Sequence, residues 1–246
     1  EIKPDFADAH YNLGNALKNL GQLDAAVKSY EQALEIKPDF ADAFNNLGTT
    51  LKNLGQLSAA VKSYEQALAI KPDYADAFNN LGNALRDLGQ LDAAVKCYEK
   101  ALSIKPDYAD AHYNLGLTIR DLGQPEKALA SYERAIALNP NLDFILGDLL
   151  STKMSLCLWD DLAKSLNELT KKINNGEKVI NPFHLLGLID DPVVQRKTAE
   201  IYANEKYPQS DVLPKIERYP KHEKIRIGYF SADFGNHPVA HLTAEL

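Results

Sequence analysis

The stretch Lys-Pro-Asp-Phe-Ala-Asp-Ala-Phe-Asn-Asn-Leu-Gly at residues 37–48 decides the fold of this chain, because it recurs at a fixed interval. It returns nearly unchanged at residues 71–82 and 105–116, and its opening half stands at residues 3–6. The prolines in this register are spaced by 34 residues: Pro4, Pro38, Pro72, Pro106 and Pro140. A period of this length predicts an array of repeats, in which each unit packs mainly against its neighbours.

The composition excludes several classes of protein. Of the 246 residues, 45% are hydrophobic and 25% are charged, and the formal net charge is −7. This negative charge disfavours nucleic acid as a partner, because nucleic-acid binding depends on neutralising phosphates. The sequence contains no run of about 18 apolar residues, so we expect no membrane-spanning helix. Cys97 and Cys157 stand alone, so we expect buried or half-buried thiols, no metal site and a reducing, cytoplasmic compartment.

Each repeat is predicted to contain two helices, here called A and B. In the second unit, helix A is expected from about Ala41 to Leu54, and Pro38 ends the preceding helix B. Asp39 with Asp42 is expected to cap helix A, and Ser58 to cap helix B, as do Asp24 and Asp92 in other units. A glycine able to adopt a left-handed conformation follows each helix A: Gly21, Gly55, Gly89 and Gly123.

The other recurrent positions are explained by packing. The apolar residues that recur at helical spacing in the second unit are Leu47, Leu51, Val61, Tyr64 and Leu68. Small residues stand where the two helices should cross closely: Gly48, Ala60 and Ala67. A bulky residue at Gly48 is therefore expected to cost about 1–3 kcal/mol by overpacking. The aromatic residues Phe44, Tyr64 and Tyr74 could form a binding strip, but packing explains them better.

These units resemble tetratricopeptide repeats. The signature places of that family are occupied in the first full unit by Leu13, Gly14, Ala26, Tyr30, Ala33 and Pro38. The resemblance implies an all-α, right-handed superhelix over residues 1–142. Its units lie near residues 7–40, 41–74, 75–108 and 109–142, after the tail of another unit.

An asparagine at the sixth position of every unit is not part of this general signature. It is Asn12, Asn46, Asn80 and Asn114. Helix A lines the concave surface of such a superhelix, so the amides would form a ladder there. Each amide can both donate and accept, so the ladder could bind the main chain of an extended peptide of any sequence. Alternatively, each asparagine holds the neighbouring repeat by an internal hydrogen bond. A second column, Asn15 and Asn83, is interrupted by Thr49 and Leu117.

The period decays over residues 143–220, which we interpret as a degenerate capping repeat followed by a helical linker. The glycine of the turn is lost, and a longer second helix is expected to begin at Trp159-Asp160-Asp161-Leu162. Asn174-Asn175-Gly176 should end that helix, and further helices should begin at Pro182 and Pro192. His184 is expected to be a packed helix residue rather than a ligand. A polar linker follows from Pro208 to Pro220.

Residues 221–246 change character. Lys-Ile-Arg-Ile-Gly-Tyr-Phe-Ser at residues 224–231 is rich in β-branched and aromatic residues and predicts a strand, and a loop and a helix start follow it. This order is how an open α/β sheet begins.

The run Arg226-Ile-Gly-Tyr-Phe-Ser-Ala-Asp-Phe-Gly-Asn-His-Pro-Val-Ala-His-Leu242 closely resembles the opening of the catalytic domain of O-linked N-acetylglucosamine transferases. Those enzymes are two-lobed glycosyltransferases, and the resemblance places His237 in the active site, as a hydrogen-bond partner or proton acceptor near the attacking hydroxyl. His241 would support the loop. The family implies UDP-N-acetylglucosamine as donor and serine or threonine hydroxyls of a polypeptide as acceptors. A related branch, similar to the SPINDLY proteins, uses GDP-fucose.

Both ends of the chain look cut, and the donor-binding lobe would lie downstream. We therefore expect residues 221–246 to be the truncated start of a catalytic domain. We expect this piece, which holds no cofactor, to be inactive and its parent to be a transferase. The alternative is a non-enzymatic adaptor whose repeats bind extended peptides. A homo-oligomer is left open.

Overall fold

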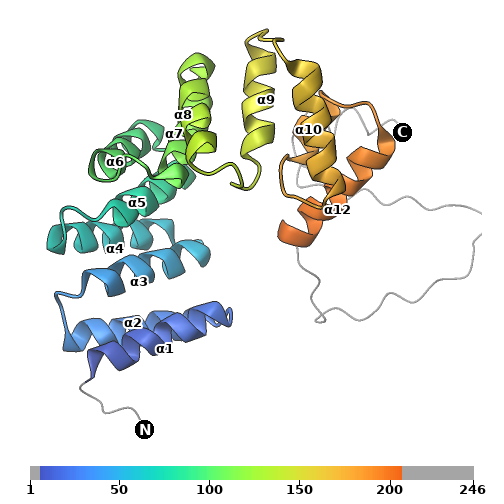
Figure 1. Cartoon of the computed structure of the whole chain (residues 1–246). Helices are drawn as coiled ribbons and strands as arrows, with labels where there is room; N and C mark the ends of the chain where they lie inside the picture. Colours follow the sequence, from blue (N-terminus) through green and yellow to red (C-terminus); the bar gives the residue numbers. More distant parts are fainter. Residues whose placement is uncertain (1–5, 207–246) are drawn as a thin grey trace, which may run out of the picture. The chain divides into compact units, whose positions relative to one another are not determined.

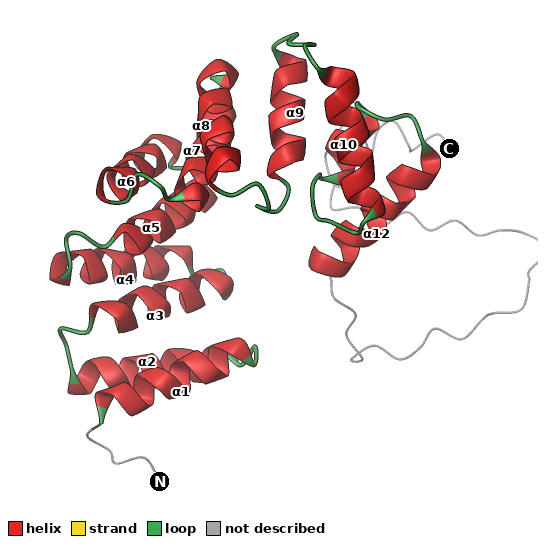
Figure 2. Cartoon of the chain, in the orientation of Figure 1, coloured by secondary structure: helices red, strands yellow, loops and turns green. Residues whose placement is uncertain are grey.

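The computed structural model describes residues 6–206 and contains only helices and loops over that range (Figures 1 and 2). The expected strand at residues 224–231, together with His237 and His241, lies outside the described residues. No helix in residues 6–206 is both long and apolar enough to cross a lipid bilayer.

Eight of the helices form four A–B pairs that are stacked in series along the chain, as Figure 1 shows. The A helices are α1 (Ala7–Asn19), α3 (Ala41–Asn53), α5 (Ala75–Asp87) and α7 (Ala109–Asp121). The B helices are α2 (Leu23–Ile36), α4 (Leu57–Ile70), α6 (Leu91–Ile104) and α8 (Pro125–Leu138). Each B helix also packs against the next A helix, so neighbouring units share their apolar faces.

The turn between the helices of each pair depends on a left-handed residue. Gly21, Gly55, Gly89 and Gly123 have φ between 74° and 76°, as the sequence predicts. The turn is retained in the fifth unit, although its glycine is lost. Cys157 follows Gly123 by 34 residues and adopts φ 55°. The backbone geometry of the repeat therefore continues one unit further than the residue type does.

The predicted side-chain caps are wrong. The N-cap residues of α3 and α4 are Phe40 and Gln56, and neither makes a capping hydrogen bond through its side chain. The other A and B helices follow the same pattern. Helix B begins two residues earlier than expected because Gln56 closes the preceding turn through its own N–H, which donates to the Leu51 carbonyl at 2.9 Å. Asp42 and Asp24 thus lie in the first turn, where a negative charge favours the helix dipole.

The core of each unit is a tyrosine of helix B seated on a glycine of helix A. Tyr30, Tyr64, Tyr98 and Tyr132 are all fully buried. A Cβ atom added to Gly48 would lie 2.7 Å from Tyr64 Cε1, and one added to Gly82 would lie 2.6 Å from Tyr98 Cε1. The expected close crossing at Gly48 is therefore confirmed, and its cause is the tyrosine ring.

The region after the repeats is built from four further helices, α9 (Ile145–Ser155), α10 (Leu162–Asn174), α11 (Pro182–Leu186) and α12 (Pro192–Lys206). Helix α10 has 13 residues and begins only at Leu162, so the longer helix expected from Trp159 is wrong. Trp159 is 54% exposed in the preceding loop, and Cys157 is exposed rather than buried. Helices α9 to α12 share a second apolar core that includes Leu150, Leu169 and Leu185.

The predicted ends of these helices are confirmed. Gly176 follows α10 with φ 81°, and Pro182 and Pro192 are the first residues of α11 and α12. The chain between α10 and α11 also completes the start of α9. The N–H of Phe144 donates to the Lys178 carbonyl at 2.6 Å, and that of Gly147 to the Val179 carbonyl at 2.8 Å. Main-chain carbonyls thus take the place of a side-chain cap for α9.

Candidate functional site

The asparagines of the sixth position form hydrogen bonds from each unit back to the preceding one. Asn80 Nδ2 donates to Asn45 Oδ1, and Asn114 Nδ2 donates to Asn79 Oδ1, each at 3.0 Å and across 35 residues of sequence. Asn46 Nδ2 donates to Tyr11 Oη at 3.0 Å and to Asn15 Oδ1 at 2.9 Å. The internal hydrogen bond that the sequence left as an alternative is therefore present at these three positions.

Each side chain keeps some hydrogen-bonding capacity beyond these contacts. An amide has two N–H donors and an oxygen that can accept. Asn80 and Asn114 each commit one donor to the neighbouring unit, so one N–H and the oxygen remain. Both are half-buried, whereas Asn12 is exposed and makes no side-chain hydrogen bond within the described part of the chain. Asn114 also borders an open hollow of about 420 Å³, which is lined as well by Asp110, Tyr113 and residues 141–143.

The second polar column connects the A helix to the buried tyrosine of its own unit. Tyr30 Oη donates to Asn15 Oδ1 and Tyr98 Oη to Asn83 Oδ1, both at 2.8 Å. Burial raises the pKa of Tyr98 to about 12, so this hydroxyl stays protonated at physiological pH. In the fourth unit, Leu117 takes the place of the acceptor. The buried Tyr132 Oη consequently has no hydrogen-bond partner in residues 6–206.

This difference predicts opposite outcomes for the same substitution in two units. Tyr98→Phe should lower the free energy of unfolding by about 1 kcal/mol, because it removes a hydrogen bond and leaves the Asn83 oxygen unpaired. Tyr132→Phe removes an unpaired buried hydroxyl and should leave stability unchanged or raise it by a few tenths of a kcal/mol. Urea unfolding followed by circular dichroism measures both. Equal losses in the two variants would contradict the unpaired hydroxyl.

Asp148 occupies the fifth place of the asparagine column, 34 residues after Asn114. It is 7% exposed and joins three side chains. Its carboxylate accepts from Tyr113 Oη at 2.6 Å and from Arg120 Nη1 at 2.7 Å, and His184 Nδ1 lies 3.5 Å away. The direction of donation is therefore reversed here, since the fourth unit donates to the fifth.

The environment of this cluster changes the pKa of its members. Burial and the adjacent Asp148 carboxylate raise the pKa of Tyr113 far above its usual value. Burial alone would lower the pKa of Arg120, but its hydrogen bond to Asp148 reverses this and the net shift is upward. Tyr113 is therefore a permanent donor and Arg120 a permanent cation at physiological pH.

A cavity of about 350 Å³ lies beside this cluster, between α7, α9, α11 and α12. Its lining includes Tyr113, Arg120, Phe144, Asp148, His184 and Lys206. It shares Tyr113 with the hollow at Asn114, so the two lie next to each other at the end of the asparagine column.

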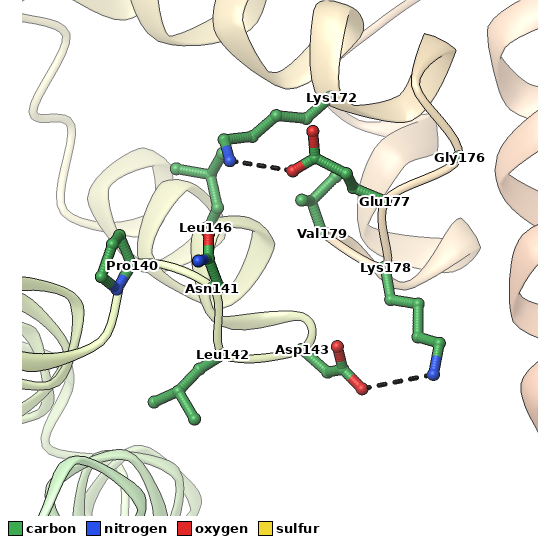
Figure 3. A pocket seen from close by; sticks show the side chains of 10 residues that line it. All are labelled: Pro140, Asn141, Leu142, Asp143, Leu146, Lys172, Gly176, Glu177, Lys178 and Val179. Atoms are coloured by element: carbon green, nitrogen blue, oxygen red, sulfur yellow. Dashed lines mark hydrogen bonds and ion pairs between the residues drawn. The ribbon is translucent and has the colours of Figure 1, made fainter.

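A second cavity, of about 360 Å³, lies between the start of α9 and residues 172–179 (Figure 3). Its charged side chains are already paired, Lys172 with Glu177 at 2.9 Å and Lys178 with Asp143 at 3.6 Å. This cavity presents no free charge to a ligand.

Sequence reasoning missed the cluster at Asp148. His184, predicted to be a packed helix residue, lies at this cluster with about 29% of its side chain exposed. The 34-residue period could have placed Asp148 in the asparagine column and beside Tyr113, as Asn46 lies beside Tyr11, but Arg120 and His184 follow no such pattern. His237 and His241 lie outside the described residues, so their roles remain predictions. In the described part of the chain, no group of acidic, histidine or cysteine residues has the arrangement of a metal site.

Models of tetratricopeptide repeats match residues 14–55, 48–85, 82–119 and 109–142, more than half of the chain. The chain belongs to the tetratricopeptide repeat family. Such repeats bind peptides or protein partners. The match agrees with the paired helices and with the glycine–tyrosine contacts described above.

Three comparisons place this tetratricopeptide repeat protein among known ones. It is 30% identical to the probable UDP-N-acetylglucosamine–peptide N-acetylglucosaminyltransferase SEC of Arabidopsis thaliana, over 40% of this chain. The matched region spans only 12% of that protein. The structure of PilF from Pseudomonas aeruginosa has a TM-score of 0.66 at 22% identity, covering 83% of this chain and 93% of PilF. YrrB, a tetratricopeptide repeat protein with an unusual peptide-binding site, has a TM-score of 0.55 at 18% identity, covering 80% of this chain and 93% of YrrB.

Proposed function

We propose that the A helices bind an extended polypeptide through the row Asn12, Asn46, Asn80 and Asn114. The observation that carries this proposal is the repetition of an amide at one position of every unit, with an N–H and an oxygen left over at Asn80 and Asn114. Donors and acceptors at a regular interval match the main chain of an extended peptide, which offers both along its length. The open hollow beside Asn114 gives a ligand access to that amide.

The bound polypeptide is, in this proposal, the acceptor of a protein O-glycosyltransferase of the cytoplasm. The parent protein would transfer N-acetylglucosamine from UDP-N-acetylglucosamine to serine or threonine hydroxyls. The similarity to the SEC protein over 40% of this chain supports this proposal, as does the resemblance of residues 226–242 to the start of a transferase domain. His237 would then lie near the attacking hydroxyl, with His241 in support.

Two alternatives keep the peptide-binding role and change the chemistry. One is an adaptor without catalysis, and YrrB, which has a similar fold, is a tetratricopeptide repeat protein with a peptide-binding site. The other is a fucosyltransferase that uses GDP-fucose.

A mass-spectrometric transfer assay with both nucleotide sugars and a peptide library distinguishes these three functions. The assay compares this chain with the product of the extended reading frame. Transfer by the longer product alone supports the transferase, and its preferred donor identifies the sugar. Peptide binding without transfer by either product supports the adaptor.

The two roles of the asparagines can be separated within this chain. Asn12→Ala should weaken the binding of an extended peptide about threefold to tenfold without changing the melting temperature, because this side chain holds no neighbouring unit. Asn80→Ala should weaken binding by a similar factor and also lower the melting temperature, because it deletes the bond to Asn45. Fluorescence anisotropy and thermal unfolding give the two readouts. Unchanged affinity in both variants would refute the ladder.

A further inference from the structure

We propose that the cavity at Tyr113, Arg120 and Lys206 binds an acidic side chain of the polypeptide held by the asparagine row. This inference rests on the proposed peptide-binding function and adds a sequence preference to it. The amide row recognises the main chain alone, so any preference among peptides must arise from neighbouring groups. The cavity is adjacent to the last amide of the row, since it shares Tyr113 with the hollow at Asn114.

The size of the cavity fits one side chain. It encloses about 350 Å³ and has aromatic walls at Tyr113, Phe144 and Tyr202. The open hollow at Asn114 adjoins it at Tyr113. The main chain of the ligand would therefore lie along the row of amides while a single side chain enters the cavity.

The charge of the lining favours a carboxylate as the occupant. Arg120 and Lys206 are cationic, and Asp148 is the acidic residue among those that line the cavity. Asp148 engages one nitrogen of Arg120, and a guanidinium has five N–H donors, so others remain for a second carboxylate. Asp121 lies 3.9 Å from Arg120 Nε, is exposed and does not line the cavity.

Lys206 is available for a ligand because its acidic neighbour is already paired. Glu205 binds Lys178 at 2.6 Å, and Lys206 makes no ion pair within residues 6–206. Its Nζ lies 5.6 Å from the centre of the Phe144 ring, which holds the ammonium group at the cavity wall. A carboxylate entering the cavity would thus face one ammonium and one guanidinium group.

An unpaired histidine nitrogen adds a third potential donor. His184 lines the same cavity, and its Nδ1 is buried without a hydrogen-bond partner in the described residues. It lies 3.5 Å from Asp148 Oδ1, too far for a good hydrogen bond. In the tautomer that carries its proton on Nδ1, this ring can donate a hydrogen bond to a second carboxylate.

The test uses the 246-residue chain and pairs of fluorescent extended peptides that differ by one glutamate or glutamine, with amidated C-termini. The glutamate position is moved along the peptide in steps of one residue. At one register, the glutamate peptide should bind about five to ten times more tightly than its glutamine partner. In Lys206→Gln this preference should fall to about twofold or less, whereas Lys164→Gln, an exposed lysine on α10, should retain it.

The outcomes distinguish this inference from the function on which it rests. Equal binding of all glutamate and glutamine pairs, with affinity still lost in Asn12→Ala, overturns the acidic pocket and leaves the peptide ladder intact. No binding of any peptide overturns both proposals. A third comparison, between free-acid and amidated peptides without glutamate, tests whether the cavity binds the C-terminal carboxylate of a peptide instead of an acidic side chain. If only the free-acid peptides bind more tightly, and glutamate has no effect, the proposal is also overturned.

Discussion

Tyr98→Ala should lower the free energy of unfolding by about 3–5 kcal/mol. The ring is fully buried between the two helices of the third unit and is in contact with Gly82. Alanine would leave a cavity there and would also remove the hydrogen bond to Asn83. Chemical denaturation followed by circular dichroism measures the loss, and a change below about 1 kcal/mol would show that the tyrosine does not form the centre of the unit.

The contact between Gly82 and Tyr98 predicts that the effect of Gly82→Ala on stability changes sign in a double-mutant cycle. Gly82→Ala alone should cost about 1–2 kcal/mol, because its Cβ would lie 2.6 Å from Tyr98 Cε1 and the ring has no room to move. In the Tyr98→Ala background, Gly82→Ala should instead stabilise the chain by up to about 1 kcal/mol, since alanine is the better helix former and the obstacle is gone. The difference between the two values is the coupling energy.

Gly89→Ala is the matched control for this cycle. Gly89 is in the same unit but has φ 75° and nothing within 4 Å of an added Cβ, so its cost comes from the backbone alone. That cost, about 1–2 kcal/mol, should be the same with tyrosine or alanine at position 98. If Tyr98→Ala relieved both glycine variants equally, the direct contact between Gly82 and Tyr98 would be refuted.

Arg120→Met should lower the free energy of unfolding by about 2–3 kcal/mol, because it leaves the buried carboxylate of Asp148 without its cation. The value is below that for a fully buried pair because the Arg120 side chain is 29% exposed. Adding Asp148→Asn should recover most of this loss. The double variant has a neutral amide at the fifth place of the column, as the first four units do.

The single variant Asp148→Asn provides the control for this pair. It keeps an acceptor for Tyr113 Oη and removes the charge, so it should cost less than Arg120→Met. Thermal and urea unfolding of all four combinations complete the cycle. Strict additivity of the two changes would mean that Arg120 and Asp148 contribute independently and that the ion pair is not a unit.

The repeat portion of the fold was predictable because its determinants are local and recur. A proline every 34 residues, a glycine after each helix A and a glycine–tyrosine pair in each unit are all visible in the sequence. Each of them acts on its own unit or on the adjacent one, so periodicity alone reveals their roles.

The helix caps were not predictable by the same reasoning. Asp24 and Ser58 are suitable capping residues, yet the turn places a glutamine at the N-cap position. The N–H of Gln56 donates to the Leu51 carbonyl, and only three residues separate the end of α3 from the start of α4. The geometry of this turn therefore overrides the preference of the side chains. The left-handed Cys157 shows the same priority of backbone geometry over residue type.

The candidate site was predictable only in part. The asparagine column is visible in the sequence, and its role in peptide binding stays a prediction. The cluster at Asp148 joins residues separated by 28 to 36 positions. Its contact with Tyr113 repeats the one between Asn46 and Tyr11, whereas its contacts with Arg120 and His184 appear once. Periodicity cannot indicate a contact that occurs once, and His184 on its five-residue helix carries no signal of its partner.

The hydrogen bonds between units bear on how such an array can change in length during evolution. The bond from Asn80 to Asn45 and the bond from Asn114 to Asn79 have the same atoms, length and sequence separation. Duplicating or deleting one such unit by recombination would therefore create no mismatched junction. The final junction differs, because Tyr113 and Arg120 donate to the Asp148 carboxylate there. Inserting or deleting a unit at this junction would therefore separate these partners. Length can vary inside the array while the boundary with α9 to α12 is inherited as one block.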